Sequence, residues 1–243
     1  IKDLKALEMR KRRKETGLFL VEGLRSVIEG VELGATLKYL AFHQSMAEKP
    51  DLQNCIAHCE TCQGMALEVT SEILSKLSHK DNPQSVIGVF EQQLQTLKYV
   101  DPQKSVCWVV LEQVRDPGNL GTIMRTVDAV GADGVILVGA CCDPYSVEAV
   151  RATMGSLFSV PIVLATQDEF VDWRTGWTGD VIGTTLQTSV DFREVTPKKP
   201  LLLMMGNEQA GLSDALRQVA TQCIRLPMNG RADSLNLSVA TGI

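Results

Sequence analysis

The second half of the chain alternates short apolar runs with helical segments, and this pattern constrains the fold more than any other feature. The apolar runs occupy residues 106–111, 134–138, 160–164, 181–184, 201–205 and 223–226. Helical character is found near residues 119–130, 146–154, 167–173 and 213–220. Continuous apolar runs are typical of strands buried on both faces of a parallel sheet. The pattern predicts a doubly wound α/β domain that binds ligands beyond the carboxyl ends of its strands.

The first half predicts a separate, small α/β/α sandwich. Helices are expected over residues 3–13, 22–33, 51–62 and 71–78, and strands over 18–21, 37–42, 65–69 and 85–90. The polar segment that follows, up to Lys104, contains Asp101-Pro102 and lacks apolar periodicity, which favours a linker. We therefore expect one domain over residues 1–95, a linker over 96–104 and a second domain over 105–243.

Composition excludes several classes of protein. A chain of 243 residues with 44% hydrophobic residues can form a core in each of two domains, and it contains no apolar run long enough for a membrane helix. Its N-terminus is basic and polar, unlike a secretory signal. Seven cysteines without the spacing of a disulfide framework favour a reducing compartment. These features predict a cytoplasmic protein.

Charge is distributed unevenly along the chain. Residues 1–14 carry seven Lys and Arg against two acidic residues, a local charge of +5, whereas the whole chain has a formal net charge of −5. Electrostatic attraction is screened over about 8 Å, so a local basic cluster can bind phosphates on an otherwise acidic protein. A solvated helix face is the alternative interpretation.

Several common α/β activities lack their motifs. The sequence has no G-x-x-x-x-G-K-[ST] loop, no G-x-G-x-x-G at a helix start and no G-x-S-x-G turn. Cys55, His58, Cys59 and Cys62 would form a stripe on one helix face, which cannot enclose a tetrahedral metal ion. We expect these residues, like Cys141-Cys142, to pack in the interior, and we expect no metal site.

Two of three strand-end segments carry candidate polar residues next to glycines. In residues 111–131, Asn119 is placed to cap a helix, and Arg125 shares a helix face with Gly121. An arginine beside a bare glycine suits an anionic ligand, and a helix cap with a surface arginine is the alternative. In residues 201–212, Gly206 frees backbone groups for a ligand and is followed by Glu208 in a tight turn.

The third segment, residues 224–243, enters a loop rich in Pro and Gly before Ser234-Leu235-Asn236 opens a helix. Ser234 taken alone is predicted to be the N-cap of this helix.

Taken together, N-x-G-x-x-x-R, G-N-E-x-x-G-L and I-x-L-P-M-x-x-x-x-x-S-L-N resemble the three motifs of the SpoU/TrmH-type RNA 2'-O-ribose methyltransferases of the SPOUT superfamily. The resemblance spans roughly residues 105–243. The first half is similar to the RNA substrate-binding domain fused to such enzymes, itself similar to small ribosomal proteins that bind kinked RNA, through Phe19-Leu-Val-Glu-Gly-Leu-Arg25 after a basic helix.

The resemblance implies a mostly parallel sheet with a C-terminal trefoil knot, a homodimer and S-adenosylmethionine as cofactor. The expected reaction is methyl transfer to a ribose 2'-hydroxyl of RNA, with 23S-type ribosomal RNA as the favoured substrate. The resemblance assigns catalytic roles to Arg125, Asn119, Glu208, Ser234 and Asn236. Expected cofactor contacts are Thr184, Gly206, Leu226, Met228 and Leu235. Expected RNA contacts are Arg10, Lys11, Arg12, Arg13, Lys14 and Arg25.

An arginine side chain stays protonated near neutral pH. We therefore expect Arg125 to bind the target phosphate and polarise the hydroxyl, with the proton leaving to that phosphate or to a transiently neutral Arg125.

Other functions stay open at this point. They are a tRNA 2'-O-methyltransferase, an antibiotic-resistance methyltransferase acting on ribosomal RNA, a non-catalytic RNA-binding ribosome-assembly protein and an α/β enzyme acting on a small molecule. A base methyltransferase is disfavoured by the S-L-N motif. The chain begins with Ile1 and stops inside a predicted helix, so truncation at both ends is expected.

Overall fold

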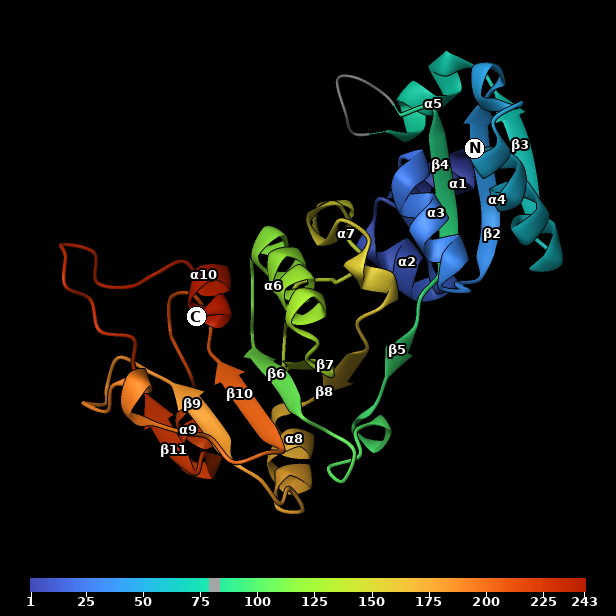
Figure 1. Ribbon diagram of the computed structural model, residues 1–243. Helices are drawn as coiled ribbons and strands as arrows, with labels where there is room; N and C mark the ends of the chain where they lie inside the picture. Colours follow the sequence, from blue (N-terminus) through green and yellow to red (C-terminus); the bar gives the residue numbers. More distant parts are fainter. Residues whose placement is uncertain (79–83) are drawn as a thin grey trace. The chain divides into compact units, whose positions relative to one another are not determined.

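The computed structural model describes residues 1–78 and 84–243, which divide into two compact units (Figure 1). Unit 1 comprises Ile1–Gln92 and Asp143–Ser159, and unit 2 comprises Gln93–Cys142 and Val160–Ile243. Unit 1 therefore includes a segment from the second half of the sequence.

Unit 1 contains a four-stranded mixed sheet in the order β1-β4-β2-β3. Strand β4 is antiparallel to β1 and β2, whereas β3 is parallel to β2. The strands are β1 Leu18–Glu22, β2 Leu37–His43, β3 Met65–Val69 and β4 Val86–Glu91. The helices are α1 Lys2–Ala6, α2 Arg10–Thr16, α3 Leu24–Glu32, α4 Pro50–Thr61, α5 Ser71–Leu77 and α7 Val147–Thr153, with the 3-10 turns η1 Gln44–Met46 and η3 Ser156–Phe158.

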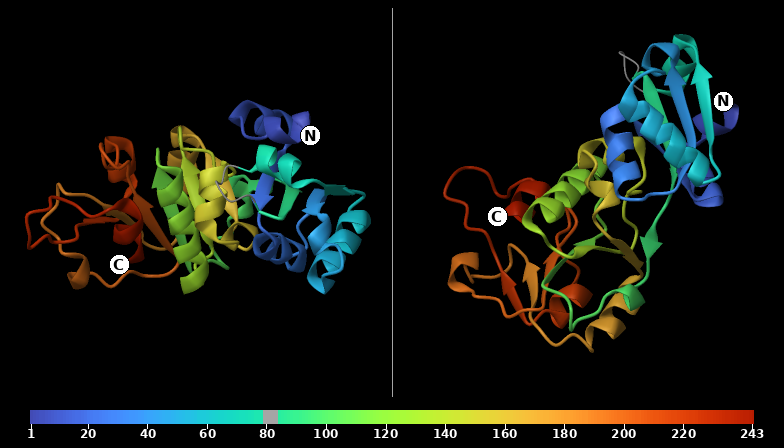
Figure 2. Two further views of the ribbon diagram at one scale, coloured as in Figure 1. Left: turned by 90° about the horizontal axis from the view of Figure 1, so that it is seen from above. Right: turned by 45° about the vertical axis from the view of Figure 1, so that its right-hand side comes forward.

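The helices of unit 1 cover both faces of this sheet, as the sandwich prediction requires. Leu4 of α1 and Leu74 of α5 pack with Leu20 and Ile87 on one face. Helices α3 and α4 contact each other and the strands β4 and β2 respectively. Views from two further directions are given in Figure 2.

The cysteines of α4 are packing residues, as predicted. Cys55 and Cys59 are buried, and burial raises the pKa of each thiol to about 11. Within the two described stretches of chain, no group of three or more His, Cys, Asp and Glu residues is placed to hold a metal ion.

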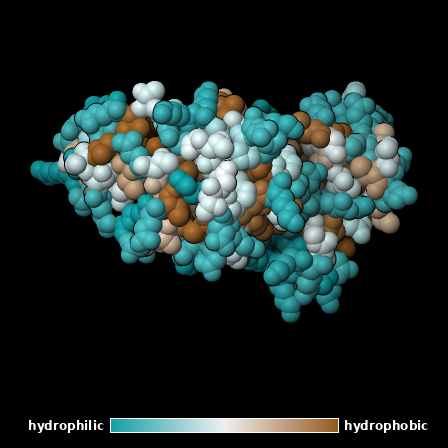
Figure 3. All heavy atoms as spheres, turned by 90° about the horizontal axis from the view of Figure 1, so that it is seen from below, coloured by the Kyte–Doolittle hydropathy of each residue, from teal (hydrophilic) through white to brown (hydrophobic). Residues whose placement is uncertain are grey.

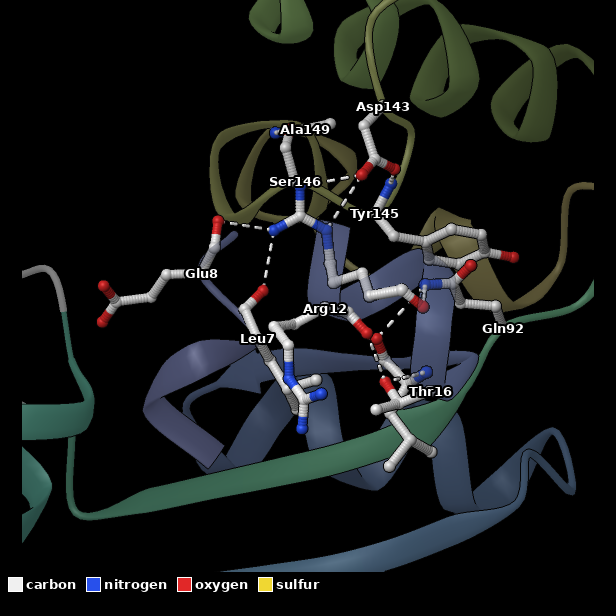
Figure 4. A network of polar contacts seen from close by, with 11 residues as sticks. Leu7, Glu8, Arg12, Thr16, Gln92, Asp143, Tyr145, Ser146 and Ala149 are labelled. Carbon is white, nitrogen blue, oxygen red and sulfur yellow. Dashed lines mark hydrogen bonds and ion pairs between the residues drawn. The ribbon is translucent and has the colours of Figure 1, made fainter. Parts of the chain in front are cut away.

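The single helix expected over residues 3–13 is in fact two short helices, α1 and α2. The buried Arg13 is the reason, because its Nη1 donates to the carbonyl oxygens of Leu7 and Glu8, both at 2.7 Å. These carbonyls lie in the turn between the two helices. Nε and Nη2 of Arg13 donate to Asp143 Oδ2 at 2.9 and 2.7 Å. Figure 4 shows Leu7, Glu8 and Asp143 around this guanidinium group.

The segment Asp143–Ser159 also contributes to the aromatic and ionic contacts of unit 1. The ring centroids of Phe19 and Tyr145 are 4.6 Å apart. Arg151 Nη2 forms an ion pair with the buried carboxylate of Glu22 at 2.8 Å. The segment is therefore part of the core of this unit.

Unit 2 contains a seven-stranded, all-parallel sheet in the order β11-β9-β10-β6-β7-β8-β5. The strands are β5 Leu94–Gln95, β6 Cys107–Glu112, β7 Gly134–Val138, β8 Ile162–Ala165, β9 Val181–Thr184, β10 Leu201–Met205 and β11 Gln222–Ile224. The helices are α6 Pro117–Val130, α8 Gln167–Arg174, α9 Asp214–Val219 and α10 Leu237–Gly242, with the 3-10 turns η2 Leu97–Tyr99 and η4 Phe192–Glu194. The sequence predicted six of these strands, and β5 is the addition.

The core of unit 2 is formed by the apolar runs of the sequence. Val110 of β6, Ile136 of β7 and Met204 of β10 are fully buried, and Phe170 of α8 and Leu216 of α9 pack against the same cluster. Helix α10 contacts α6 (Figure 1).

The surface is mostly hydrophilic on the face drawn in Figure 3, with hydrophobic residues visible in separate groups. Scattered exposed apolar side chains are normal for a folded domain. Across residues 1–78 and 84–243, no helix is both long and apolar enough to cross a membrane.

Candidate functional site

A pocket of about 690 Å³ lies in unit 2, lined by the loops that follow β9, β10 and β11 and by residues of the C-terminal segment. These three strands are neighbours in the sheet, and β6 lies next to β10. Since the strands are parallel, their carboxyl ends share one edge. The chain order reverses between β6 and β10, and such switch points are where open α/β sheets bind ligands.

The five residues predicted to contact a cofactor all line this pocket. They are Thr184, Gly206, Leu226, Met228 and Leu235. Thr184 Oγ1 donates to the carbonyl oxygen of Met204 at 3.0 Å, which fixes its side chain at the end of β9. The structure therefore brings together residues from the carboxyl ends of three strands, β9, β10 and β11, and from the loops that follow them, and their contacts with a cofactor remain a prediction.

Gly206 is required by the loop itself. A Cβ atom at this position would lie 2.1 Å from the carbonyl carbon of Gly211 and the nitrogen of Leu212. The loop after β10 folds back on itself, with Asn207 and Gly211 exchanging two backbone hydrogen bonds of 3.1 and 2.9 Å. No larger residue fits without moving this backbone.

Glu208 connects the loop after β10 to the loop after β6. Its carboxylate accepts hydrogen bonds from the backbone N–H groups of Arg115 at 3.2 Å and Asp116 at 3.3 Å, and from Asn119 Nδ2 at 3.3 Å. Partial burial raises the pKa of Glu208, but these hydrogen bonds and one from its own backbone outweigh that effect and lower the pKa below its usual value. The carboxylate is therefore ionised at neutral pH.

Asn119 and Asn236 extend this connection to the C-terminal segment. Asn236 Nδ2 donates to Asn119 Oδ1 at 2.9 Å, while Asn119 Nδ2 donates to Glu208. One hydrogen-bonded line, Glu208–Asn119–Asn236, thus joins residues from all three sequence motifs. All three side chains line the pocket and are accessible to a ligand.

The predicted helix caps are wrong in both cases. The N-cap of α6 is Asp116, whose Oδ1 accepts from the N–H of Asn119 at 2.6 Å. The N-cap of α10 is Asn236, whose Oδ1 accepts from Ser238 N at 2.9 Å, and Ser234 lies before the helix. Because other residues cap the helices, the side chains of Asn119 and Ser234 are available to the pocket that they line.

Among the residues predicted to be catalytic or to contact the cofactor, Arg125 is the one that does not line the pocket. It is exposed on α6, six residues after Asn119. At about 100° per residue, six positions place two side chains on different faces of a helix. One chain alone therefore does not bring Arg125 to the pocket beside Glu208 and Asn236.

Two further residues of this region were missed by sequence reasoning. Asn207 Nδ2 donates to the carbonyl oxygen of Gln113 at 2.8 Å, and Glu112 Oε2 accepts from Ser213 N at 2.7 Å. Asn207 is the second residue of the G-N-E-x-x-G-L motif, but the sequence assigned no role to it. The signal for Glu112 was a charge at the end of an otherwise apolar strand.

The predicted RNA contacts all belong to unit 1. Arg10, Lys11, Arg12, Lys14 and Arg25 are exposed or partly exposed. Arg13 is different: it is 4% exposed and bound to Asp143, so its guanidinium group is not available to a phosphate. This corrects the expectation for Arg13, because a basic residue in a charged run can be buried when it has a partner elsewhere in the chain.

Comparisons with known proteins agree with this arrangement. The model of the SpoU rRNA Methylase family matches residues 107–243, and that of the MRM3-like substrate binding domain matches residues 1–88. The 23S rRNA (guanosine(2553)-2'-O)-methyltransferase RlmP of Bacillus subtilis (strain 168) is 30% identical over 246 residues, covering 100% of this chain and 93% of that protein. The 23S rRNA (uridine(2479)-2'-O)-methyltransferase of Streptomyces viridochromogenes is 32% identical over 238 residues, covering 95% and 82%.

Solved structures of methyltransferases are also similar to this chain over almost its whole length. The AdoMet-bound rRNA methyltransferase from Sinorhizobium meliloti has a TM-score of 0.93 and 45% sequence identity, covering 99% of this chain and 90% of that one. The SpoU methyltransferase AviRb from Streptomyces viridochromogenes, in complex with AdoMet, has a TM-score of 0.88 and 30% identity, covering 99% and 93%. With its three motifs joined at one pocket, the chain belongs to the SpoU rRNA methylase family.

Proposed function

We propose that this protein transfers a methyl group from S-adenosylmethionine to a ribose 2'-hydroxyl of RNA, with 23S-type ribosomal RNA as its substrate. The observation that carries the proposal is the line Glu208–Asn119–Asn236, which joins the three motifs at one pocket. The names of the relatives, which are 23S rRNA 2'-O-methyltransferases, support the same reaction and substrate class.

The pocket suits a cofactor of this size and polarity. Its volume of about 690 Å³ falls within the range of about 300 to 1,000 Å³ that is usual for small-molecule sites. Leu226, Met228 and Leu235 offer apolar surface to an adenine ring, and the closed turn at Gly206 presents backbone groups. When bound, S-adenosylmethionine supplies an electrophilic methyl group on its sulfonium.

The side chains of the three motifs have the chemistry to position a ribose. A 2'-hydroxyl is a weak nucleophile, so it must be held in line with the methyl group and helped to lose its proton. The amides of Asn119 and Asn236 and the hydroxyl of Ser234 can donate to or accept from the sugar. The ionised Glu208 holds Asn119 in place. No other step is assigned to these residues.

We propose that the protein is a homodimer and that Arg125 takes part in the reaction of the other copy. Because Arg125 lies outside the pocket of its own chain, we propose that it reaches the pocket of a second copy, where it binds the target phosphate. The trefoil knot that the resemblance implies stays a prediction.

The proposed order along the chain is a substrate-binding domain over residues 1–95, a linker over 96–104 and a methyltransferase domain over 105–243, from which the segment Asp143–Ser159 packs with unit 1. The 2'-hydroxyl restricts the reaction to RNA. A cytoplasmic location fits a chain whose cysteines form no disulfide in the part of the sequence that the structure describes.

The reaction can be tested directly. Ribosomal RNA from cells that lack the gene should gain one ribose 2'-O-methyl group when it is incubated with the protein and S-adenosylmethionine, mapped by primer extension at low nucleotide concentration. Transfer RNA and protein-free reactions are the controls. Methylation confined to transfer RNA or to bases would contradict the proposed substrate or the proposed atom.

The exposed cations of α2 provide a second test. Changing Arg10, Lys11 and Lys14 to Gln should weaken RNA binding several-fold and reduce the slope of log affinity against log salt by about 2 to 3, since each of the three lost phosphate contacts removes about 0.7 to 0.9 units. Filter binding over a salt series measures this. Lys104→Gln, at an exposed surface position of unit 2, is the matched control. An unchanged slope would exclude α2 from the RNA interface.

A further inference from the structure

The loop over residues 206–213 connects β10 to α9 and forms one wall of the pocket. Seven consecutive residues of this loop, 206–212, line the cavity. The shape of the pocket therefore depends on where this backbone lies relative to the neighbouring strand β6. Two side chains outside the predicted set of site residues hold it there.

Asn207 makes the first connection with both ends of its amide. Its Oδ1 accepts from the backbone N–H groups of Gln209 at 2.9 Å and Ala210 at 3.1 Å, which shapes the turn. Its Nδ2 donates to the carbonyl oxygen of Gln113 at 2.8 Å, which fastens the turn to the exit of β6. One side chain thus both folds the loop and attaches it.

The acceptor of this bond lies in an unusual backbone conformation. Gln113 has a φ of 51°, in the left-handed region that residues other than glycine rarely adopt. Its N–H donates to the carbonyl oxygen of Val138 at 3.0 Å, so it is held on the side of β7 as well. A strained residue persists only where its surroundings fix it, and such positions concentrate at functional sites.

Glu112 makes the second connection at the far end of the loop. It is 2% exposed, and its Oε2 accepts from Ser213 N at 2.7 Å. Its Oε1 is buried and has no hydrogen-bond partner in the part of the chain that the structure describes. A buried carboxylate with so few partners is energetically unfavourable. Its presence at the end of an apolar strand therefore indicates a role other than core packing.

We propose that Glu112 and Asn207 are positioning residues for the methyl donor. They clamp the two ends of the loop 206–213 to the C-terminal end of β6. The clamp holds the pocket in its binding conformation before the cofactor enters. The inference rests on the proposed function, because it names the donor as the ligand of this pocket. Neither residue is given a part in the chemical step.

The test is the affinity for S-adenosylhomocysteine, measured by isothermal titration calorimetry on the full chain. Asn207→Asp keeps the oxygen that accepts from Gln209 and Ala210 but removes the donor to Gln113 and places a negative charge near that carbonyl. We expect Kd to rise about tenfold with an unchanged circular dichroism spectrum, which corresponds to the loss of one hydrogen bond. Asn54→Asp, the same change at an exposed position of α4, should leave Kd unchanged.

Glu112 is tested by a pair of variants. Glu112→Gln retains an oxygen that can accept from Ser213 N, so we expect Kd within about threefold of the wild type. Glu112→Ala removes the acceptor and should raise Kd at least tenfold. If the alanine variant does not fold, the Kd of Asn207→Asp alone tests the clamp. RNA affinity without cofactor should be unchanged in every folded variant, because the basic cluster expected to bind RNA belongs to unit 1 and neither Glu112 nor Asn207 is an expected RNA contact.

The outcomes separate this inference from the proposed function. If the wild type does not bind S-adenosylhomocysteine, the proposed function fails. If the wild type binds it and Asn207→Asp binds within twofold of the wild type, the proposed function stands and the clamp is overturned. An increase in Kd for Asn207→Asp with an intact fold and unchanged RNA affinity supports the clamp.

Discussion

Replacing Arg125 by alanine should lower the rate of methyl transfer by about 100- to 1,000-fold while leaving the affinity for S-adenosylhomocysteine unchanged. The expected loss is that of removing one charged group that stabilises a transition state. Binding should persist because Arg125 is proposed to contact the target phosphate of the RNA and not the cofactor, and it is not among the residues that line the pocket of its own chain. Single-turnover rates on ribosomal RNA and calorimetry measure the two quantities. Lys104→Ala, which removes an exposed surface cation, is the control.

Mixed dimers can show which chain supplies the arginine. Arg125→Ala and Asn236→Ala are each expected to be inactive as pure proteins. If Arg125 serves the pocket of the other copy, a heterodimer of the two variants contains one pocket with both residues intact and should recover about half of the wild-type rate. Purification through two different affinity tags isolates that heterodimer. A heterodimer as inactive as its parents would place Arg125 in its own chain's reaction and contradict the proposal.

Replacing Arg13 by leucine should lower the free energy of unfolding by about 3 to 5 kcal/mol, the cost typical of breaking a buried ion pair. Arg13 is 4% exposed and Asp143 14% exposed, so the carboxylate would be left inside the protein without its cation. The carbonyl oxygens of Leu7 and Glu8 would lose their donor as well. Urea denaturation followed by circular dichroism measures the change.

The neighbouring Arg12 offers a matched control. It is 38% exposed and pairs with Glu15 at the surface, so Arg12→Leu should change the free energy of unfolding by no more than about 1 kcal/mol. Adding Asp143→Leu to Arg13→Leu should recover part of the lost stability, because no unpaired charge then remains. Equal effects of Arg12→Leu and Arg13→Leu would refute a structural role for the buried pair.

The strands of the fold were predictable because burial on both faces leaves a local signature in the sequence. Val110, Ile136 and Met204 lie in apolar runs that form β6, β7 and β10. Strand β5 has two residues, Leu94 and Gln95, which is too short for any periodicity to be read. The mixed sheet order in unit 1 depends on pairings between distant strands, which periodicity does not encode.

The pocket was predictable to the extent that its residues lie at the ends of neighbouring parallel strands. Errors arose where a partner elsewhere in the chain decides the role of a side chain. Arg13 was grouped with the surface cations because a run of charges does not reveal the buried Asp143. Asn119 was taken for a cap although Asp116, three residues earlier, performs that role. Glu112 and Asn207 were missed because the backbone groups that join them to another loop, Ser213 N and the carbonyl oxygen of Gln113, lie about 100 residues away in the sequence.

The inclusion of Asp143–Ser159 in unit 1 means that the chain passes between the two units three times, after Gln92, after Cys142 and after Ser159. A single proteolytic cut within residues 96–104 would sever only one of these passages. The two resulting fragments would remain associated. The larger fragment carries Tyr145 and Arg151, which contact Phe19 and Glu22 in the interior of the smaller fragment. The N-terminal portion of this enzyme could therefore not be replaced by an unrelated domain unless the segment between β7 and β8 were replaced with it.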